Sequence, residues 1–350
     1  MAQAPVSPTI QQLIAEEAKK VFEAHKEAID KTMDKKLIIN IAASGSFVDI
    51  SHNPYLPVTT EEVAKQVADA YNAGAAMWHI HPRDPDTGST FLPIEKRLKI
   101  HKEWCDAVFS VAPDIITNVG ATYVIPPTII GPIVDEKSIL AEKRMAPLVD
   151  PVIKFGPNNR YIEVGISLCH TAALGRGTNF LSFNNKVGII SDVNFFQSRG
   201  IRVELSPFKH SDLQDAKEWV IDTGIARPPV ILDTLMGVHN SPTPKLGMEA
   251  FELLFTYVRM LPKGVLWQTI VGGRYWLPLT VAGIILGADM VRIGMEDSVY
   301  MYPHRDDFIK GCGKVVESVA GIARYLGREV ATPSEARKML GLPQIHSEKY

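Results

Sequence analysis

The sequence predicts a single (β/α)8 barrel, for three reasons. After residue 36, short apolar runs alternate with stretches of helical spacing, eight times in strict order. The runs are almost continuously apolar, as expected of strands that are covered on both faces. The chain has 350 residues and 46% hydrophobic composition, which is enough to bury one large core. Together these features favour a closed parallel barrel over a doubly wound open sheet.

Eight apolar runs provide the expected strands. They are residues 37–43, 75–81, 114–119, 161–168, 201–205, 229–232, 264–270 and 288–294. The expected helices lie between and after them, at 59–71, 93–110, 135–144, near 192–199, 211–222, 245–261, 277–286, 306–326 and 333–340. Thr60 is the expected cap of the first helix. Since a helix follows each strand, the strands are expected to run parallel.

The first 36 residues predict a separate helical arm, which leaves residues 37–350 for the barrel. Ser7 and Pro8 form a helix start, with proline in the first turn. Apolar residues then recur at helical spacing and charges fill the opposite face, the apolar ones being Ile10, Leu13, Ile14, Ala18, Val21 and Phe22. Such an arm packs on its own domain or on a neighbouring subunit, and we favour the neighbouring subunit.

Composition excludes several classes of protein. The net charge of −2 gives no electrostatic case for a nucleic-acid partner. No apolar run is long enough to span a membrane, and the N-terminus lacks a signal-peptide pattern. Cys105, Cys169 and Cys312 have no metal-type spacing, and their odd number argues against a disulfide framework. We therefore expect a cytoplasmic enzyme without nucleic-acid or membrane partners.

A histidine pair ends the second predicted strand. His79 and His81 are two residues apart, so on a strand both side chains point to the same face. Pro82 and the turn residues 83–88 place the pair at the carboxyl end of the strand. Active sites of (β/α)8 barrels lie at that end. Two imidazoles converging there form a metal-site geometry that needs a third ligand.

Glu296 is the candidate third ligand. It follows the eighth strand, and the eighth and second strands both flank the first strand of a closed barrel. Two histidines and one carboxylate are the usual shell of a catalytic zinc or a similar divalent ion. In the alternative interpretation, the histidines are hydrogen-bonded core residues. His170, His210 and His239 follow later strands and are weaker candidates.

Arg292 and Asp297 form a second candidate group at the end of the eighth strand. Arg292 shares its alternation with Gly294 and Glu296, so it points into the barrel or its mouth. A buried guanidinium needs an anionic partner, and Asp297 is the natural one. The pair is either a structural ion pair or a carboxylate held beside a metal, where it can abstract a proton.

Further residues after the strands are candidates for binding a substrate. Gly272, Gly273 and Arg274 follow the seventh strand, where loops of barrels often bind phosphate or carboxylate. Backbone N–H groups at a helix start and the Arg274 guanidinium both favour an anion. The other candidates, each of which is as readily a plain loop residue, are Ser44, Ser46, Gly120, Thr122 and Glu204.

The histidine pair followed by Arg-Asp, together with the late Arg-x-Gly-x-Glu-Asp, resembles the β-keto acid cleavage enzyme family. The matching segments span nearly the whole chain from Leu37 onward. They are LPVTTEEVAKQVADAYNAGAAMWHIHPRDPDTG, RMAPL, WQTIVGGRYWLPLT, VRIGMEDSVY and LGREVATPSEARKML. As a set, these motifs are specific.

The resemblance implies a zinc-dependent (β/α)8 barrel with one Zn2+ per subunit. It implies His79, His81 and Glu296 as zinc ligands and Arg292 with Asp297 as the catalytic pair. The implied reaction condenses a β-keto acid with acetyl-CoA and gives acetoacetate and an acyl-CoA by a retro-Claisen route. In it, Asp297 is expected to deprotonate the methyl group of acetyl-CoA. A homo-oligomer, with a tetramer favoured, is also implied.

The chain departs from the family pattern near the expected substrate. Phe47 stands near the position of a glutamate that suits an amino group in the aminohexanoate-cleaving members. The usual Ser-Thr-Gly-Gly after the third strand is replaced by residues 118–122, and residues 149–180 are longer than typical. We therefore expect a different substrate, in which a cationic group is less favoured.

Two other functions are open. A metal-dependent hydrolase of amidohydrolase type also uses a His-x-His pair, but normally on the first strand, with more histidines on the fifth and sixth and an aspartate on the eighth. Here a strand precedes the pair and the late acids are Glu-Asp. A non-catalytic barrel that binds a metal or a keto acid is the second alternative.

Overall fold

Eight parallel strands close into a barrel in the computed structural model, which describes residues 9–23, 26, 33–46, 48–120, 140–169, 172–174, 181–237, 241 and 247–345. Around the barrel the order is β1, β2, β3, β4, β7, β8, β9 and β10. Their bounds are β1 Ile38–Ala42, β2 Met77–Ile80, β3 Ile116–Val119, β4 Val164–Leu168, β7 Arg202–Ser206, β8 Ile231–Met236, β9 Leu266–Val271 and β10 Met290–Ile293. The closed sheet confirms the predicted fold class and the eight predicted strands.

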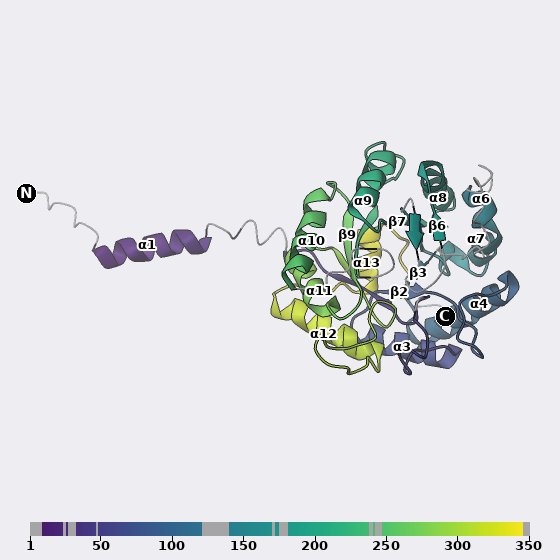
Figure 1. Ribbon diagram of the computed structural model, residues 1–350. Coiled ribbons are helices and arrows are strands. Elements are labelled where there is room, and N and C mark those ends of the chain that lie inside the picture. Colours follow the sequence, from purple (N-terminus) through teal and green to yellow (C-terminus); the bar gives the residue numbers. More distant parts are fainter. Residues whose placement is uncertain are drawn as a thin grey trace, which may run out of the picture.

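Helices surround this barrel, as Figure 1 shows. They are α3 (Thr60–Ala73), α4 (Ile94–Val111), α6 (Ala141–Arg144), α7 (Ala146–Ile153), α8 (Lys186–Ser198), α9 (His210–Ala216), α10 (Gly247–Met260), α11 (Trp276–Ile285), α12 (Cys312–Tyr325) and α13 (Pro333–Leu340). A 3-10 turn, Pro157–Asn159, follows α7, and one π-helical stretch, Lys217–Ile221, continues α9. Outward side chains of the strands pack under these helices in the main apolar core.

Strand β1 lies between β10 and β2. Ile41 pairs with Ile293 of β10, and Ala42 pairs with His79 of β2. Because all three strands are parallel, their carboxyl ends open at the same mouth of the barrel. The loops after β10 and β2 therefore meet beside the end of β1, as expected from the sequence.

The barrel interior has an apolar layer below a polar one. Ile38, Met77 and Met290 belong to a buried cluster that α13 closes with Ala336 and Leu340. Two residues further along each strand, side chains point the same way. On β4 that position holds the buried Ile166, and on the other seven strands it holds a buried polar residue, namely Asn40, His79, Asn118, Glu204, Asp233, Gln268 and Arg292. The polar layer thus lies between the apolar layer and the mouth.

Three expected elements differ from the structure. The cap of α3 is Thr59 rather than Thr60, because the Thr59 side chain accepts from Glu62 N while Glu62 caps in return. Helix α8 begins earlier than predicted, with Asn185 as its cap. Helix α12 begins at Cys312 rather than near residue 306, because Tyr300 and Phe308 form an antiparallel bridge in the preceding loop.

A short antiparallel hairpin outside the barrel was not predicted. It consists of β5 (Ala172–Leu174) and β6 (Leu181–Phe183). Strand β5 falls within residues 149–180, the stretch that departs from the family pattern, and β6 directly follows that stretch. Of the predicted helix 135–144, the structure describes only the last part, in which α6 lies.

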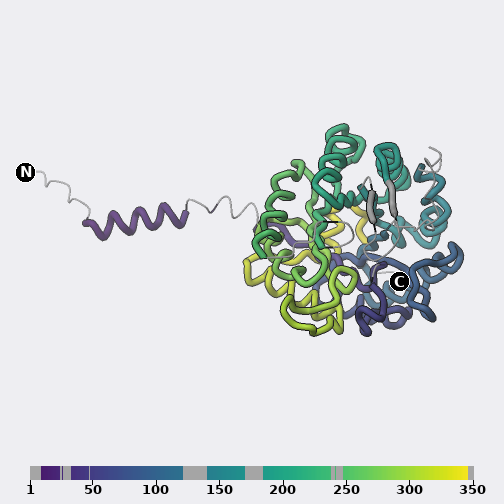
Figure 2. The backbone as a smooth tube through the Cα atoms, in the orientation of Figure 1, coloured from purple at the N-terminus to yellow at the C-terminus, as the bar shows by residue number. Residues whose placement is uncertain are grey.

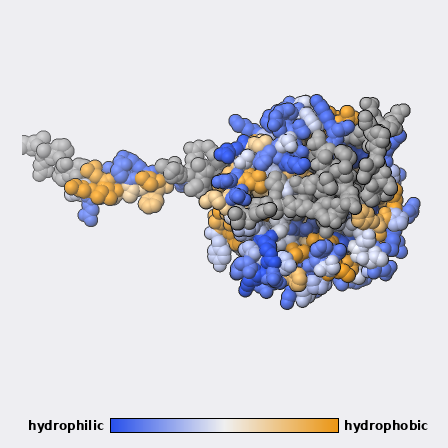
Figure 3. Space-filling model, viewed as in Figure 1, coloured by the Kyte–Doolittle hydropathy of each residue, from blue (hydrophilic) through white to orange (hydrophobic). Residues whose placement is uncertain are grey.

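The predicted arm contains a helix, α1 (Ile10–Glu23), which lies apart from the barrel in Figures 1 and 2. It has no buried residue, and its apolar side chains, among them Ile14 and Phe22, are exposed. Figure 3 shows apolar side chains gathered along one side of α1. The helix is confirmed, and the surface that it covers stays a prediction. In the described part of the chain, every helix is too short or too polar to cross a membrane.

Candidate metal centre and active site

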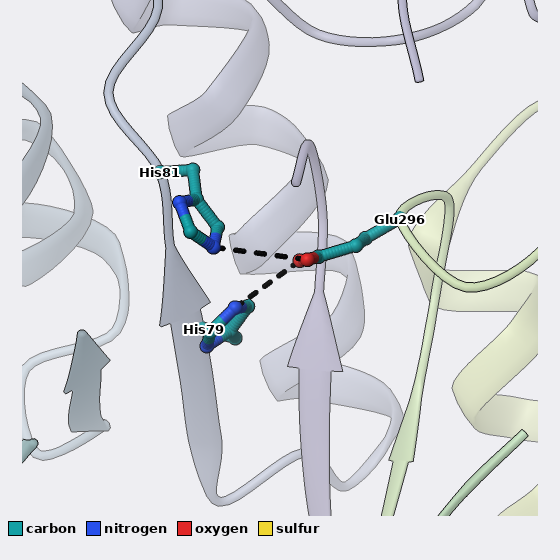
Figure 4. A group of neighbouring side chains, drawn as sticks. All are labelled: His79, His81 and Glu296. Carbon is teal, nitrogen blue, oxygen red and sulfur yellow. Dashed lines mark ion pairs between the residues drawn. The ribbon is translucent and has the colours of Figure 1, made fainter. Parts of the chain in front are cut away.

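Two imidazoles lie at the end of β2. His79 is inside the strand and His81 directly follows it, and their side chains are 1% and 4% exposed. The ring centroids are 4.7 Å apart and the planes meet at 75°. Figure 4 shows both rings and the Glu296 carboxylate pointing toward one another. The alternation of the strand therefore delivers both side chains to one point, as predicted.

Glu296 reaches the same point from the loop after β10. Its Oε2 lies 3.2 Å from His79 Nε2, and its Oε1 lies 3.7 Å from His81 Nε2. The Glu296 backbone N–H donates to Ala42 O of β1 at 3.3 Å, which fixes the loop against the barrel. Ligand atoms of all three side chains lie within 4.8 Å of one another.

Two glycines leave the space that these side chains fill. A Cβ on Gly120 would lie 2.4 Å from His81 Cε1. A Cβ on Gly45, whose φ is +64°, would lie 2.3 Å from the Glu296 Cβ. Both positions therefore require glycine if the rings and the carboxylate are to meet.

The charges of this group suit a cation. Burial lowers the pKa of His81 well below its ordinary value, so the ring is neutral near pH 7. Burial opposes ionisation of Glu296, yet the nearby His79 and Arg292 hold its pKa well below the usual range. Glu296 Oε2 is buried and has no hydrogen-bond donor among the described residues. Imidazole lone pairs and an unsatisfied carboxylate oxygen at one point form a donor set that fits a divalent metal.

Arg292 and Asp297 lie directly beside this group. Arg292 Nη2 donates to Asp297 Oδ1 at 2.6 Å and its Nε donates to Oδ2 at 3.2 Å. Arg292 Nη1 also lies 3.4 Å from His79 Nε2. Burial raises the pKa of Asp297 to about 6, against the opposing effect of Arg292. The carboxylate form therefore prevails at pH 7, where it can accept a proton.

Arg83 was missed as a structural residue of the site. It is 2% exposed, and its Nη2 donates to Ser44 O at 3.0 Å, to Gly45 O at 2.6 Å and to Val48 O. Its Nη1 donates to Gly88 O at 2.8 Å. It thereby ties the loop after β1 to the loop after β2. The available signal in the sequence was an arginine in the turn that directly follows His81 and Pro82.

The predicted substrate residues occupy different places. Ser44 is buried, with its Oγ 3.5 Å from His81 O, so it borders the histidine pair. Glu204 is buried deeper, and its Oε2 accepts from Asn118 Nδ2 at 2.8 Å. Burial and then the charge of Asp233 raise the pKa of Glu204 well above its ordinary value.

Arg274 lies on the rim. Its guanidinium donates to Arg305 O at 2.9 Å and to the Asp306 carboxylate, and it stacks on Tyr300 at 4.0 Å. In the same loop, Gly273 N donates to Asp297 O at 2.8 Å, which links the glycine pair to the backbone of the proposed base.

Several sequence-based candidates are not brought into the metal group. His210 stacks on Tyr257, with ring centroids 4.4 Å apart. Ser46 has a buried Oγ with no hydrogen-bond partner among the described residues. Thr122, Phe47, His170 and His239 lie outside the residues that the structure describes.

This arrangement agrees with a family match over most of the chain. A family model described as beta-keto acid cleavage enzyme matches residues 36–342. The chain belongs to the beta-keto acid cleavage enzyme family. The resemblance inferred from the motifs is thereby confirmed, and the chain is an enzyme of this family. Most of the arm that holds α1 lies outside the matched residues.

The matches to relatives in this family cover almost the full length of each relative. The chain is 28% identical to a 3-keto-5-aminohexanoate cleavage enzyme of Fusobacterium nucleatum subsp. nucleatum, over 89% of this chain and 99% of the relative. It is 30% identical to the enzyme of the same name from Acetoanaerobium sticklandii, over 88% and 99%. It is 24% identical to a 3-dehydrocarnitine:acetyl-CoA trimethylamine transferase of Rhizobium meliloti, over 89% and 98%.

A solved structure supports the fold. The apo structure of ObcA has a TM-score of 0.62 and 19% sequence identity, and the match covers 83% of this chain and 66% of that chain. At this identity the likeness bears on the barrel architecture alone.

Proposed function

We propose that this chain is a zinc-dependent enzyme that reacts a β-keto acid with acetyl-CoA and releases acetoacetate and a new acyl-CoA. Membership of the family supports the reaction class. The main structural support is the buried group of His79, His81 and Glu296, with a Glu296 oxygen that no described residue satisfies. Two imidazoles and one carboxylate are a usual shell for a catalytic zinc with an open position.

The chain's own residues would share the work as follows. When bound, Zn2+ would polarise the keto group and stabilise negative charge on its oxygen. Asp297 accepts a proton from the carbon acid, since its carboxylate form prevails at pH 7. Arg292 holds that carboxylate by two parallel hydrogen bonds and so fixes its direction.

The products decide which proton Asp297 removes. The expected deprotonation of the acetyl-CoA methyl group is wrong, because attack by that carbon on the ketone would not give acetoacetate plus an acyl-CoA. Instead Asp297 removes a proton from C2 of the β-keto acid, between the ketone and the carboxylate. The C2 carbanion attacks the thioester carbonyl, the C–S bond breaks and CoA thiolate leaves. The thiolate then adds to the original keto carbon, the C2–C3 bond breaks, and C2 takes the proton back. Atoms balance as acetoacetate and acyl-CoA.

For substrate binding we propose Ser44, Gly120, Thr122, Glu204 and Arg274. The position of Ser44 beside His81 supports a role next to the reacting atoms. Gly120 lies against the His81 ring, where the absence of a side chain leaves room for that ring, and this supports a place beside the reacting atoms. Arg274, on the rim, is better placed for an anionic group of CoA than for the keto acid, and it would exchange Asp306 for that anion.

A homo-oligomer, with a tetramer favoured, and a cytoplasmic location remain predictions. The family resemblance supports the oligomer. The exposed apolar side of α1 fits the expectation that the arm packs on a neighbouring subunit.

The proposal is tested with the full chain, purified and assayed for bound zinc. A panel of β-keto acids is incubated with and without acetyl-CoA, and keto-acid loss, acetoacetate and acyl-CoA are followed. We expect turnover of at least one keto acid only with acetyl-CoA, and its loss on chelation and recovery with Zn2+. Keto-acid loss without any thioester would support the metal-dependent hydrolase instead. Zinc binding without turnover across a broad panel would support a non-catalytic barrel.

A further inference from the structure

A ring of buried hydrogen bonds crosses the barrel in the same polar layer as His79. Asn118 Nδ2 donates to Glu204 Oε2 at 2.8 Å, and Gln268 Nε2 donates to Asp233 Oδ1 at 2.9 Å. Asn40 Nδ2 lies between them, 3.4 Å from Asn118 Oδ1 and 3.2 Å from Gln268 Oε1. Ser206 Oγ donates to the remaining oxygen of Asp233. The ring joins β1, β3, β7, β8 and β9, and all its members are at most 4% exposed.

Asn118 is the member of this ring that touches a proposed metal ligand. It pairs with His79 across β2 and β3, so the two side chains lie next to each other on the inner face. Asn118 Oδ1 is 2.6 Å from His79 Nδ1. The proposed reaction, as described above, does not use this hydrogen bond.

The ring decides which way the Asn118 amide points. Two neighbours indicate the same orientation of the amide. Asn118 Nδ2 faces Glu204 Oε2, and Asn118 Oδ1 faces Asn40 Nδ2. The atom facing His79 is therefore an acceptor, so Nδ1 of His79 must carry the proton. A neutral imidazole with its proton on Nδ1 has its lone pair on Nε2. That nitrogen is the one 3.2 Å from Glu296.

We propose that Asn118 is a positioning residue that holds His79 as the Nδ1–H tautomer and directs its Nε2 lone pair to the metal. The inference rests on the metal site of the proposed function. Outer hydrogen-bond partners of ligating histidines fix the ring and the tautomer, and their loss typically costs about 10–100-fold in metal affinity. The ring of hydrogen bonds, whose members lie on five strands, holds the Asn118 side chain in one orientation. The side chain is therefore already ordered before the metal binds.

Two substitutions separate this role from ordinary packing. Asn118→Leu removes the acceptor with little change in volume, and Asn118→Asp keeps an acceptor for His79. The control is Thr234→Val, which removes a buried hydrogen bond from Trp267 Nε1 on the outer side of the barrel. Zinc affinity is measured by competition with a chromophoric chelator. The tautomer is measured by 15N NMR of histidine-labelled metal-free protein, with His79→Gln used to assign the signal.

We expect the metal-free wild type to show a protonated Nδ1 in His79. Asn118→Leu should lose that preference and bind zinc about 10–100-fold more weakly. Asn118→Asp should keep the tautomer and nearly all of the affinity, and Thr234→Val should leave both unchanged. A metal-free wild type in which His79 carries no proton on Nδ1 would overturn the inference, as would wild-type zinc affinity in Asn118→Leu.

The tautomer measurement needs neither zinc nor a folded Asn118→Leu variant, so it decides the inference even if that variant does not fold. If the wild type bound no zinc, the metal site of the proposed function would fail instead. The state of the His79 ring would still show whether Asn118 sets the tautomer.

Discussion

At the scale of single residues, the meeting of the three proposed ligands depends on glycines as much as on the ligands themselves. Gly120 faces the His81 ring and Gly45 faces the Glu296 side chain, each at a distance where a Cβ could not fit. The sequence predicted the ligands, because His-x-His on a strand and a late acidic pair follow simple alternation. It proposed Gly120 for substrate contact, whereas in the structure Gly120 also makes room for a ring.

Gly120→Ala should weaken zinc binding strongly, because its Cβ would push the His81 ring out of line with His79 and Glu296. The measurement is zinc content after dialysis together with a chelator titration. Gly321→Ala is the matched control, since nothing lies near its added Cβ in helix α12. That variant should bind zinc normally and be more stable by about 0.5–1 kcal/mol. Full zinc occupancy in Gly120→Ala would contradict this view of the site.

Asp297→Asn should lower kcat by about 10²–10⁴-fold, because an amide cannot accept the proton from the carbon acid. Zinc content should stay at the wild-type level, since Asp297 is not among the three proposed metal ligands. Steady-state kinetics and metal analysis of the same preparation test both parts. A variant with wild-type kcat would remove Asp297 from the proposed role.

The activity should fall at acidic pH, because the proposed base Asp297 must be ionised to accept a proton. The pKa of Asp297 is raised to about 6 by burial, and the proposed reaction uses its carboxylate form. Below this pKa the Asp297 carboxyl group is protonated and cannot accept a proton. We therefore expect kcat to rise with pH and to level off above the pKa. A bound divalent cation would shift the midpoint lower still. A midpoint above pH 7 in the rate profile would argue for a different base.

At the scale of elements, the loops after β1 and β2 depend on one buried cation. Arg83 donates to backbone carbonyls in both loops, including that of Gly45 next to Glu296. The sequence predicted the turn after His81 but not this contact, because the partners are carbonyl oxygens that carry no signature of their own. The start of α12 was missed for the same reason, since the Tyr300–Phe308 bridge is a pairing across a loop.

Arg83→Met should reduce the free energy of unfolding by at least ~2 kcal/mol, because the carbonyls in both loops lose a charged donor in a buried place. It should also weaken zinc binding, as the Gly45 loop borders Glu296. Arg305→Met is the control, since its ion pair with Asp307 is half exposed and should change stability by less than ~1 kcal/mol. Denaturant unfolding compares the variants. Equal losses in both would contradict a special role for Arg83.

At the scale of the whole molecule, closure of the barrel assembles the site. It places β10 and β2 on either side of β1, so residues far apart in sequence share one mouth. This much was predictable, since eight apolar runs alternating with helices allow few other folds. The inner ring of Asn40, Asn118, Glu204, Asp233 and Gln268 was not, because it depends on the mutual register of five strands. The surface on which α1 packs was likewise not predictable. Composition alone does not define which surface or which neighbouring chain a helix covers.

The central claim is that the acetyl group of acetyl-CoA becomes half of acetoacetate. The direct measurement is to supply acetyl-CoA carrying 13C at its carbonyl to the zinc-loaded enzyme with a β-keto acid that it turns over, and to follow the products by NMR. The account predicts the label at C3 of acetoacetate and unlabelled acyl-CoA in equal amount. Label in acetate, or unlabelled cleavage products formed without consumption of acetyl-CoA, would contradict it.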